Sequence, residues 1–307
     1  GYEVAVVYAL GDALNTTTAA WANDGSETAD SYEFRAGDHH DGMSFFGLGS
    51  DGKWSSKTSD KGLLCLNHEN ITSAFLHASG PTTVDGKRPV DEALKEINCH
   101  GVSVVAINRQ SNGSFAVDKA NTLNRRVTPN TVMEFHGPAA ASRFLVTKYD
   151  AKAKKGRGTL NNCANGYTPW GTYLTCEENW AGYFKRPSTD DSLRSTAELA
   201  SLKRYGVTSS TGANSWSTAS DSDDRFTRWN ATILDVAKTA DTDFRNEPNT
   251  FGWVVEIDPF NSSNAPRKRT ALGRFAHEGC EIAPVKVGKP VVFYMGDDSR
   301  GEYIYKF

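Results

Sequence analysis

The stretch NCANGYTPWG at residues 162–171 has two counterparts in the chain, DHHDGMSFFG at residues 38–47 and FAHEGCEIAP at residues 275–284. Each string places a polar residue directly before a glycine. The triplets that superimpose are His40-Asp41-Gly42, Ala164-Asn165-Gly166 and His277-Glu278-Gly279. Because self-similarity along a chain is the signature of repeat architectures, these strings divide the sequence into three units.

An apolar run follows each string and reaches acidic residues at its end. The runs are GLLCLNHEN with Glu69, GTYLTCEEN with Glu177 and Glu178, and PVVFYMGDD with Asp297 and Asp298. Their β-branched and aromatic residues, their length and their flanking glycines predict strands. Each repeat therefore carries acids at the end of its second strand.

A third strand is predicted to close each unit, at residues 101–109, 252–260 and 301–307. Three or four strands per repeat, with polar residues recurring at equivalent strand ends, indicate the blades of an all-β fold, the β-propeller. Propellers close with about four to eight blades. We therefore expect an incomplete ring, with blades missing from this chain or a degenerate blade at residues 131–149.

The domain organisation follows from these units. We expect residues 1–307 to form a single propeller domain or a fragment of one. Residues 181–250, rich in Ser, Thr, Asp and Asn, interrupt the middle unit between its second and third strands. Long loops in compact folds are functional lids or disordered segments, so this insertion is either a lid over one propeller face or a solvated, partly ordered loop.

Composition excludes several classes of protein. The 307 residues carry 34 Lys and Arg against 37 Asp and Glu, a net charge of −3, which lacks the basic excess of nucleic-acid-binding proteins. No apolar run is long enough for a membrane span, and the first residues do not form a signal peptide. The five cysteines contain no C-x-x-C pair, which argues against a zinc ribbon or a disulfide scaffold. We expect a soluble monomer.

Carboxylates that converge at strand ends repel one another unless protons or cations neutralise them. Calcium takes six to eight oxygen ligands, and this chain offers many. A solvated strand-end charge is the alternative for any single acid. The candidate oxygen ligands are Asp38, Asp41, Glu69, Asn165, Glu177, Glu178, Asn179, Glu256, Asp258, Glu278, Asp297, Asp298 and Glu302.

Cys163 stands at the start of the second unit, among these acids. A thiolate is a soft ligand that selects iron, zinc or copper, so its presence beside carboxylates predicts a mixed site of one transition metal and several hard cations. The alternative is a small buried side chain. The histidines His39, His40, His68, His136 and His277 are either ligands or hydrogen-bonded structural residues.

Arg300 follows the acidic end of the third unit. A guanidinium beside carboxylates at a metal site offers a planar pair of donors to phosphate oxygens. Alternation along the predicted strand would place Arg300 and Glu302 on one face. The alternative is a surface ion pair of Arg300 with Asp297 or Asp298.

Several of these strings together resemble a known family. GDHHDGMSFFGL, LLCLNHEN, NNCANGYTPWGTYLTCEENW, FGWVVEIDP, GRFAHEG and GDDSRGEYIYKF resemble the motif set of the PhoX-type alkaline phosphatases, a family of exported bacterial phosphatases. The resemblance covers most of the chain and spares the insertion at 181–250. It implies a six-bladed propeller whose active site holds ferric iron and calcium ions bridged by an oxo group.

The resemblance also assigns residues and a location. It implies that the metal ligands are Cys163, Glu178, Glu256 and Glu302, with Asp258 near them, and that Asn179 and Arg300 hold the substrate phosphate. The recurrence of acids at equivalent strand ends, rather than the resemblance, adds Asp41, Glu69 and Glu278 as further candidate metal ligands. Family members are longer, with an N-terminal twin-arginine export signal and further blades. This implies a periplasmic or secreted protein and a truncated member of the family, whose own activity is a separate question.

The sequence therefore predicts an enzyme, an alkaline phosphatase that hydrolyses small phosphomonoesters with a metal-bridging oxygen as the nucleophile. Neither a G-x-S-x-G string nor a P-loop string is present, which argues against a serine hydrolase and a P-loop enzyme. Two alternatives stay open. One is a calcium-dependent propeller lactonase or esterase, which would have no use for Cys163. The other is a non-catalytic binding propeller stabilised by calcium.

Overall fold

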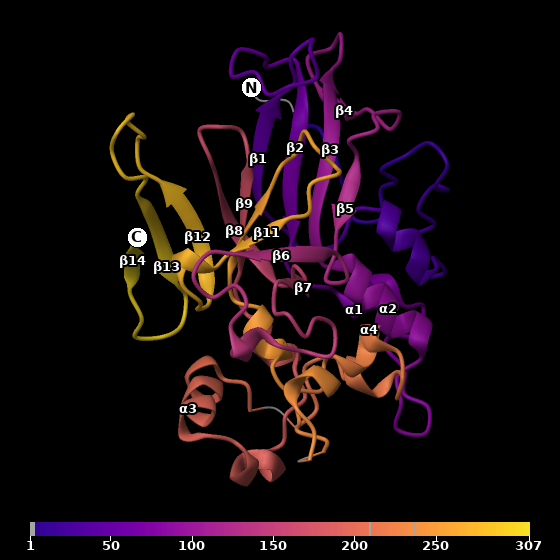
Figure 1. The fold of residues 1–307 in the computed structure, drawn as a ribbon. Helices are drawn as coiled ribbons and strands as arrows, with labels where there is room; N and C mark the ends of the chain where they lie inside the picture. Colours follow the sequence, from indigo (N-terminus) through magenta and orange to yellow (C-terminus); the bar gives the residue numbers. More distant parts are fainter. Residues whose placement is uncertain (1–3, 209, 236) are drawn as a thin grey trace.

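The three sequence repeats form three equivalent groups of antiparallel strands (Figure 1). The computed structural model describes residues 4–208, 210–235 and 237–307. In each group the second strand pairs with the first and the third. The groups are β1 (His40–Gly47), β2 (Lys61–His68) and β3 (Gly101–Arg109); β8 (Asn162–Tyr167), β9 (Tyr173–Glu177) and β10 (Val254–Ile257); and β12 (His277–Ile282), β13 (Phe293–Asp297) and β14 (Ile304–Lys306).

Additional strands extend two of the three sheets. In the first sheet, β4 (Phe115–Val117) and β5 (Arg125–Val127) both pair with β3. The second sheet has the order β7-β6-β11-β10-β9-β8, in which β11 and β6 are parallel. Its added strands are β6 (Val132–His136), β7 (Lys155–Arg157) and β11 (Arg267–Arg269). The third sheet contains β12, β13 and β14.

Two expectations about strands are corrected here. Residues 131–149 do not form a degenerate blade, because β6 joins the second sheet through its parallel pairing with β11. The last predicted strand is shorter than expected, because β14 begins at Ile304. Arg300 and Glu302 precede it, around Gly301, which has a φ of 82° that suits a turn. Strand alternation therefore says nothing about where these two side chains point.

A β-bulge occurs at the same place in each repeat. The register shifts between His40 and Met43 in β1, between Asn162 and Asn165 in β8, and between Glu278 and Cys280 in β12. In β1 and β12 the bulge lies at the polar-Gly triplet, but in β8 it lies at Cys163 and Ala164, just before Asn165 and Gly166. The register therefore aligns Cys163, rather than the Asn165 of the triplet, with Asp41 and Glu278. Because a bulge bends a strand and re-aims its side chains, the three bulges mark the positions where this fold redirects polar groups.

The first strands of the three sheets pack on one another, with β8 in contact with both β1 and β12. Glycine makes this close packing possible. A Cβ atom on Gly166 in β8 would lie 1.7 Å from the carbonyl oxygen of Cys280 in β12, and one on Gly42 in β1 would lie 2.8 Å from Asn165 Oδ1. Gly42 and Gly166 are therefore required by the contacts between neighbouring sheets.

Helices lie mainly at one end of the sheets (Figure 1). Within the described residues, none is long and apolar enough to cross a membrane. The α-helices are α1 (Ser73–Leu76), α2 (Val90–Cys99), α3 (Thr196–Tyr205) and α4 (Asp224–Thr227). The 3-10 helices are η1 (Ala29–Phe34), η2 (Arg143–Leu145), η3 (Trp180–Tyr183), η4 (Ser188–Leu193), η5 (Trp216–Thr218), η6 (Ala240–Thr242), η7 (Glu247–Thr250) and η8 (Thr270–Leu272).

Residues 181–250 connect β9 to β10 and contain α3 and α4. Their aromatic side chains Phe184, Trp216, Phe226 and Trp229 are buried in one cluster with apolar residues of α2. Burial of an aromatic side chain stabilises a fold by roughly 1.5–3 kcal/mol. The segment is therefore anchored to the body of the protein through its own hydrophobic core.

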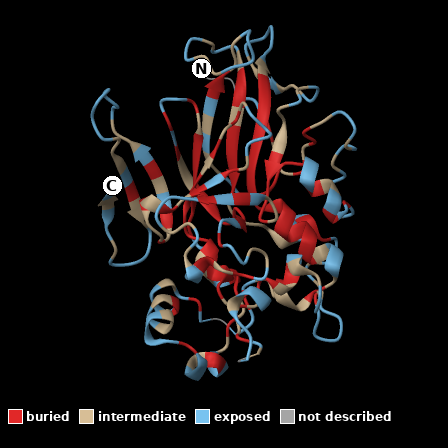
Figure 2. Ribbon diagram, viewed as in Figure 1, coloured by how far each residue is buried: buried red, intermediate tan, exposed pale blue. Residues whose placement is uncertain are grey.

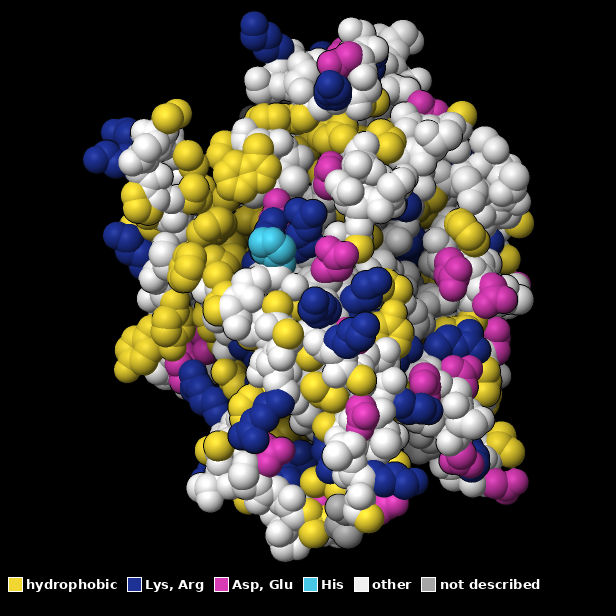
Figure 3. Space-filling model, in the orientation of Figure 1, with side chains coloured by type: hydrophobic (Ala, Val, Ile, Leu, Met, Phe, Trp, Pro, Cys, Tyr) yellow, Lys and Arg dark blue, Asp and Glu magenta, His cyan; other side chains and the backbone are white. Residues whose placement is uncertain are grey.

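Burial is uneven across the three sheets (Figure 2). A core cluster containing Phe46, Val104, Tyr173 and Val255 lies between the first and second sheets. The C-terminal sheet is less covered, and hydrophobic side chains gather on it in the space-filling view (Figure 3). Ile304 in β14 is 79% exposed. The first two sheets thus share a buried core that the C-terminal sheet does not join.

We predict that Gly166→Ala destabilises the fold. The added methyl group would overlap the Cys280 carbonyl oxygen, and overpacking of this kind costs about 1–3 kcal/mol. Thermal unfolding followed by circular dichroism measures the effect. The matched control is Gly182→Ala, because no atom lies within 4 Å of the Cβ position at Gly182. Equal melting temperatures for the two variants would contradict the close contact of β8 with β12.

Candidate functional site

One ionisable side chain from each bulged strand meets one from the end of its partner strand. We call these six residues the cysteine-carboxylate cluster. Its members are the pairs Asp41 and Glu69, Cys163 and Glu178, and Glu278 and Asp298, one pair from each repeat. The repeat architecture therefore delivers equivalent acids, and one thiol, to a common point.

Distances within the cluster are short. Ligand atoms of Glu69, Cys163 and Glu178 all lie within 4.8 Å of one another, as do those of Glu178, Glu278 and Asp298. Glu178 belongs to both groups and links them. Cys163 Sγ lies 3.5 Å from an oxygen of Asp41 and 3.7 Å from an oxygen of Glu278. All six side chains thus belong to one connected site.

The electrostatics of the cluster oppose ionisation. Burial, a hydrogen bond with Asp298 and the charge of Glu69 raise the pKa of Glu178 to about 8. Burial and the nearby carboxylates also raise the pKa values of Glu69 and Glu278. The pKa of the Cys163 thiol is raised by burial and then by Glu178 and Asp41. Each of these groups is therefore harder to ionise than it would be in water, because burial and the neighbouring acids outweigh the favourable interactions of its charged form.

Buried hydrogen bonds fix the backbone of Cys163. The Asn67 side chain, fully buried on β2, donates Nδ2 to the carbonyl oxygens of Cys163 and Ala164. Its Oδ1 accepts a hydrogen bond of 2.8 Å from the hydroxyl of Thr175 on β9. Asn67 thus ties the bulge of β8 to strands of two sheets and keeps the thiol directed into the cluster.

Asn161 performs a similar role for the carboxylates, and the sequence analysis missed it. Its Nδ2 donates to the carbonyl oxygen of Glu69, and its Oδ1 accepts from the backbone N–H of Asn179 at 2.7 Å. Its carbonyl oxygen accepts from the N–H of Glu178. Asn161 has a φ of 49°, a conformation that Asn tolerates better than most residues. An Asn directly before the first strand of the second repeat is the feature of the sequence that could have identified it.

Glu177 differs from its neighbour Glu178. It is completely buried and pairs with Lys268 at 2.7 Å, where both side chains are excluded from solvent. It also accepts hydrogen bonds from Thr159 and from the backbone of Trp253. Successive side chains of a strand point to opposite faces, which explains why Glu177 stabilises the second sheet while Glu178 enters the cluster.

The structure does not bring Glu256 and Asp258 to the cluster. Glu256 pairs in register with Leu174, four residues before Glu178, which corresponds to about 13 Å along a strand. Its carboxylate accepts hydrogen bonds from Thr172 at 2.7 Å and from Arg269 at 2.6 Å. Glu256 and Asp258 line a separate cavity of about 220 Å³ with Arg267 and Arg269. Their role as ligands stays a prediction that this geometry does not support.

The three remaining predicted residues are Asn179, Arg300 and Glu302, which lie outside the cluster itself. Asn179 lines a cavity of about 320 Å³ together with Glu178, Asp297 and Ser299. Arg300 is exposed on the turn before β14. Glu302, on the same turn, pairs with Arg204 of α3 and accepts a hydrogen bond of 3.0 Å from Tyr305. Glu302 is thus placed beside the cluster, with its carboxylate held by an arginine.

Comparison with known proteins identifies the family. The model of the family "Alkaline phosphatase PhoX" matches residues 1–307, the whole chain. The chain belongs to the PhoX alkaline phosphatase family. No curated protein matches the chain.

Among solved structures, the chain is similar to Pseudomonas fluorescens PhoX in complex with vanadate, a transition state analogue. The two share 37% sequence identity and superimpose with a TM-score of 0.80. The match covers 99% of this chain and 46% of the solved chain, so this chain spans less than half the length of that PhoX. The likeness, together with the prevalence of sheet, confirms the predicted fold class, an all-β fold of the propeller kind.

The donor set of the cluster fits metal ions. It offers one thiol and five carboxyl groups, a combination of one soft and several hard ligands that suits a transition metal beside calcium. The raised pKa of Glu178 shows that the uncompensated site is costly to ionise, and bound cations would remove this cost. The cluster, rather than any single acid, is therefore the candidate metal centre.

We predict that calcium raises the melting temperature of the chelator-treated protein, because cations bound only by the folded state stabilise it by about 2.7 kcal/mol at one hundred times their Kd. Differential scanning calorimetry with and without calcium measures this shift. Glu178→Gln should lose most of the shift, because Glu178 joins both halves of the cluster. Glu281→Gln is the matched control, since Glu281 is an exposed acid of β12. A calcium response equally large in both variants would show that the ion binds elsewhere.

Proposed function

We propose that this chain contributes the metal centre of a phosphatase that hydrolyses small phosphomonoesters, with iron and calcium as its metals. The observation that carries the proposal is the meeting of Cys163 with five carboxyl groups from three repeats. Membership of the PhoX family and the likeness to a PhoX that binds vanadate support the reaction class. The activity is a proposal for this chain because it covers less than half of that relative.

The six members of the cluster divide by chemistry. We assign iron to Cys163 with Glu69 and Glu178, because this group contains the thiol and its ligand atoms lie within 4.8 Å of one another. We assign calcium to the group of Glu178, Glu278 and Asp298, which offers oxygen only. When bound, such cations neutralise phosphate charge and activate an oxygen nucleophile.

The protein's own residues then position the metal ligands and the substrate. Asn67 holds the backbone of Cys163, and Asn161 holds the backbone that carries Glu69, Glu178 and Asn179. Asn179 lines the cavity beside the cluster, where its amide can donate to a phosphate oxygen. Arg300, exposed on the adjoining turn, is the second residue proposed to contact phosphate. Glu302 lies on that turn and is retained as a candidate ligand.

The remaining parts of the proposal concern context. The cavity beside the cluster, about 320 Å³, is of a size that suits a small molecule. We propose that residues 181–250 form a lid, since α3 supplies one wall of that cavity. We also propose that the protein is a monomer and is exported to the periplasm or secreted, as the family resemblance implies.

We predict that Cys163→Ser abolishes bound iron and hydrolysis of a chromogenic phosphomonoester, because a hydroxyl cannot replace a thiolate at iron. Elemental analysis and the rate per folded molecule measure both effects. Cys280→Ser is the matched control, since Cys280 is also buried but belongs to a hydrophobic cluster. Unchanged iron content in Cys163→Ser would contradict the ligand assignment. Cleavage of a carboxylic ester or lactone, with calcium alone bound, would instead favour a lactonase.

A further inference from the structure

Arg204, on the segment between β9 and β10, reaches the rim of the cysteine-carboxylate cluster. It pairs with Glu302 and lies 3.7 Å from the carboxylate of Asp297, the residue before the cluster member Asp298. The cavity of about 320 Å³ that Asn179 lines also contains Arg204. Of the described residues that line this cavity, Arg204 is the only cation, whereas Glu178 and Asp297 are acids. An anionic substrate that enters here therefore meets one positive side chain of the protein.

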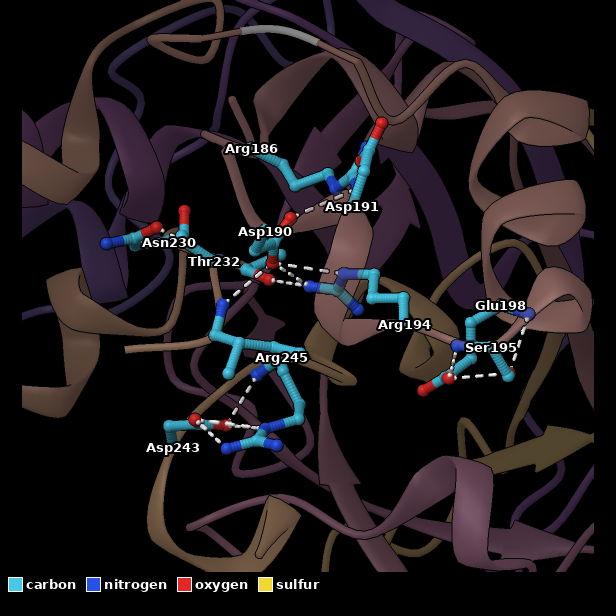
Figure 4. Close-up of polar contacts among 12 residues, drawn as sticks. Arg186, Asp190, Asp191, Arg194, Ser195, Glu198, Asn230, Thr232, Asp243 and Arg245 are labelled. Atoms are coloured by element: carbon cyan, nitrogen blue, oxygen red, sulfur yellow. Dashed lines mark hydrogen bonds and ion pairs between the residues drawn. The ribbon is translucent and has the colours of Figure 1, made fainter. Parts of the chain in front are cut away.

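The helix that carries Arg204 is fixed at its beginning. Ser195 and Glu198 form a reciprocal capping box at the start of α3. Just before it, the buried carboxylate of Asp190 accepts hydrogen bonds from Arg186 and Arg194 (Figure 4). These contacts define where the axis of α3 begins.

The end of α3 is fixed as well. Gly206 ends the helix with a φ of 75° and donates its N–H to the carbonyl oxygens of Leu202 and Lys203. The Tyr205 hydroxyl donates to the carbonyl oxygen of Arg274 at 2.8 Å, and its ring packs against Trp180, next to Asn179. Because both ends are anchored, α3 presents Arg204 to the cavity at a defined position.

The partner of Arg204 shows what the guanidinium can bind. Glu302 supplies a carboxylate, a planar anion with two oxygens, and the oxygens of a phosphate can accept hydrogen bonds from the same pair of guanidinium donors. Glu302 lies on a turn outside β14, while the Arg204 side chain is 46% exposed. The Glu302 side chain is 16% exposed, so water reaches the pair from the side of Arg204. Ion pairs open to solvent contribute little to the stability of a fold, so Arg204 exchanges its partner at a correspondingly small cost.

We propose that Arg204 is a substrate-binding residue of this site, which holds the phosphate group after Glu302 has released the guanidinium. This inference rests on the proposed function for the identity of the substrate, but its ligand is the phosphate group itself. The proposed role of Arg204 gives residues 181–250 a specific function, because this segment then supplies a phosphate-binding side chain as well as covering the site. It also predicts that carboxylate and phosphate compete for one guanidinium.

Titration calorimetry with inorganic phosphate on the full chain, as purified with its metals, tests the proposal. Arg204→Ala should raise the Kd for phosphate ten- to a hundredfold, and Arg204→Lys should raise it less because the charge remains. Lys203→Ala is the matched control. It removes the same charge from the neighbouring residue of α3, which is exposed and lines a different cavity, and it should leave the Kd within twofold of the wild type.

A Kd for phosphate that is unchanged within twofold in Arg204→Ala would overturn the proposal. If the melting temperature of that variant is also lowered, the ion pair of Arg204 with Glu302 only fastens α3 to the turn. Hydrolysis of a chromogenic phosphomonoester, measured in parallel, separates this proposal from the proposed function. A wild-type chain that binds phosphate without hydrolysing the ester would contradict the proposed function, and the Kd of Arg204→Ala would still decide the role of Arg204. A wild-type chain that binds no phosphate at millimolar concentration would overturn both.

Discussion

Repulsion among the acids of the cysteine-carboxylate cluster is the constraint on which the rest of this structure depends. Five carboxyl groups and a thiol meet where three sheets approach one another, and burial together with the neighbouring acids raises the pKa of Glu178 to about 8. The acids are held together by the buried amides of Asn67 and Asn161, whose hydrogen bonds fix the backbone rather than the charged groups. The fold thus maintains an electrostatically unfavourable site that cations would relieve.

The scaffold produces this site by repetition. Each repeat supplies a bulged strand and a partner strand, so one side chain at the bulge meets one acid at the strand end. The glycine of the triplet lets the inner strands pack closely, as Gly166 does against Cys280. Variation at one position then gives the site its chemistry, because the second repeat carries Cys163 where the others provide only carboxylates. The soft ligand is therefore a local change within a symmetric arrangement.

Features that repeat could be predicted from the sequence, and features that depend on unique tertiary contacts could not. The triplets and acidic strand ends located the paired strands and indicated Asp41, Glu69, Glu178 and Glu278 together. They aligned Asn165 with Asp41 and Glu278, whereas the strand register places Cys163 at that position. The position of Glu256 depends on its register with Leu174, away from the strand end that carries Glu178. The position of Arg300 depends on where β14 begins. A short sequence motif encodes neither the register nor the start of a strand. Arg204 belongs to a segment without a counterpart in the other repeats, so only packing of α3 places it beside Glu302.

The most direct test of the metal centre is X-ray diffraction from crystals of the purified chain, with anomalous data collected on both sides of the iron absorption edge. Our account predicts an iron peak within bonding distance of Cys163 Sγ and of carboxylate oxygens of Glu69 and Glu178. It also predicts density for calcium, without an iron signal, between Glu178, Glu278 and Asp298. Crystals grown with both metals that show no ion among these six side chains would contradict the account.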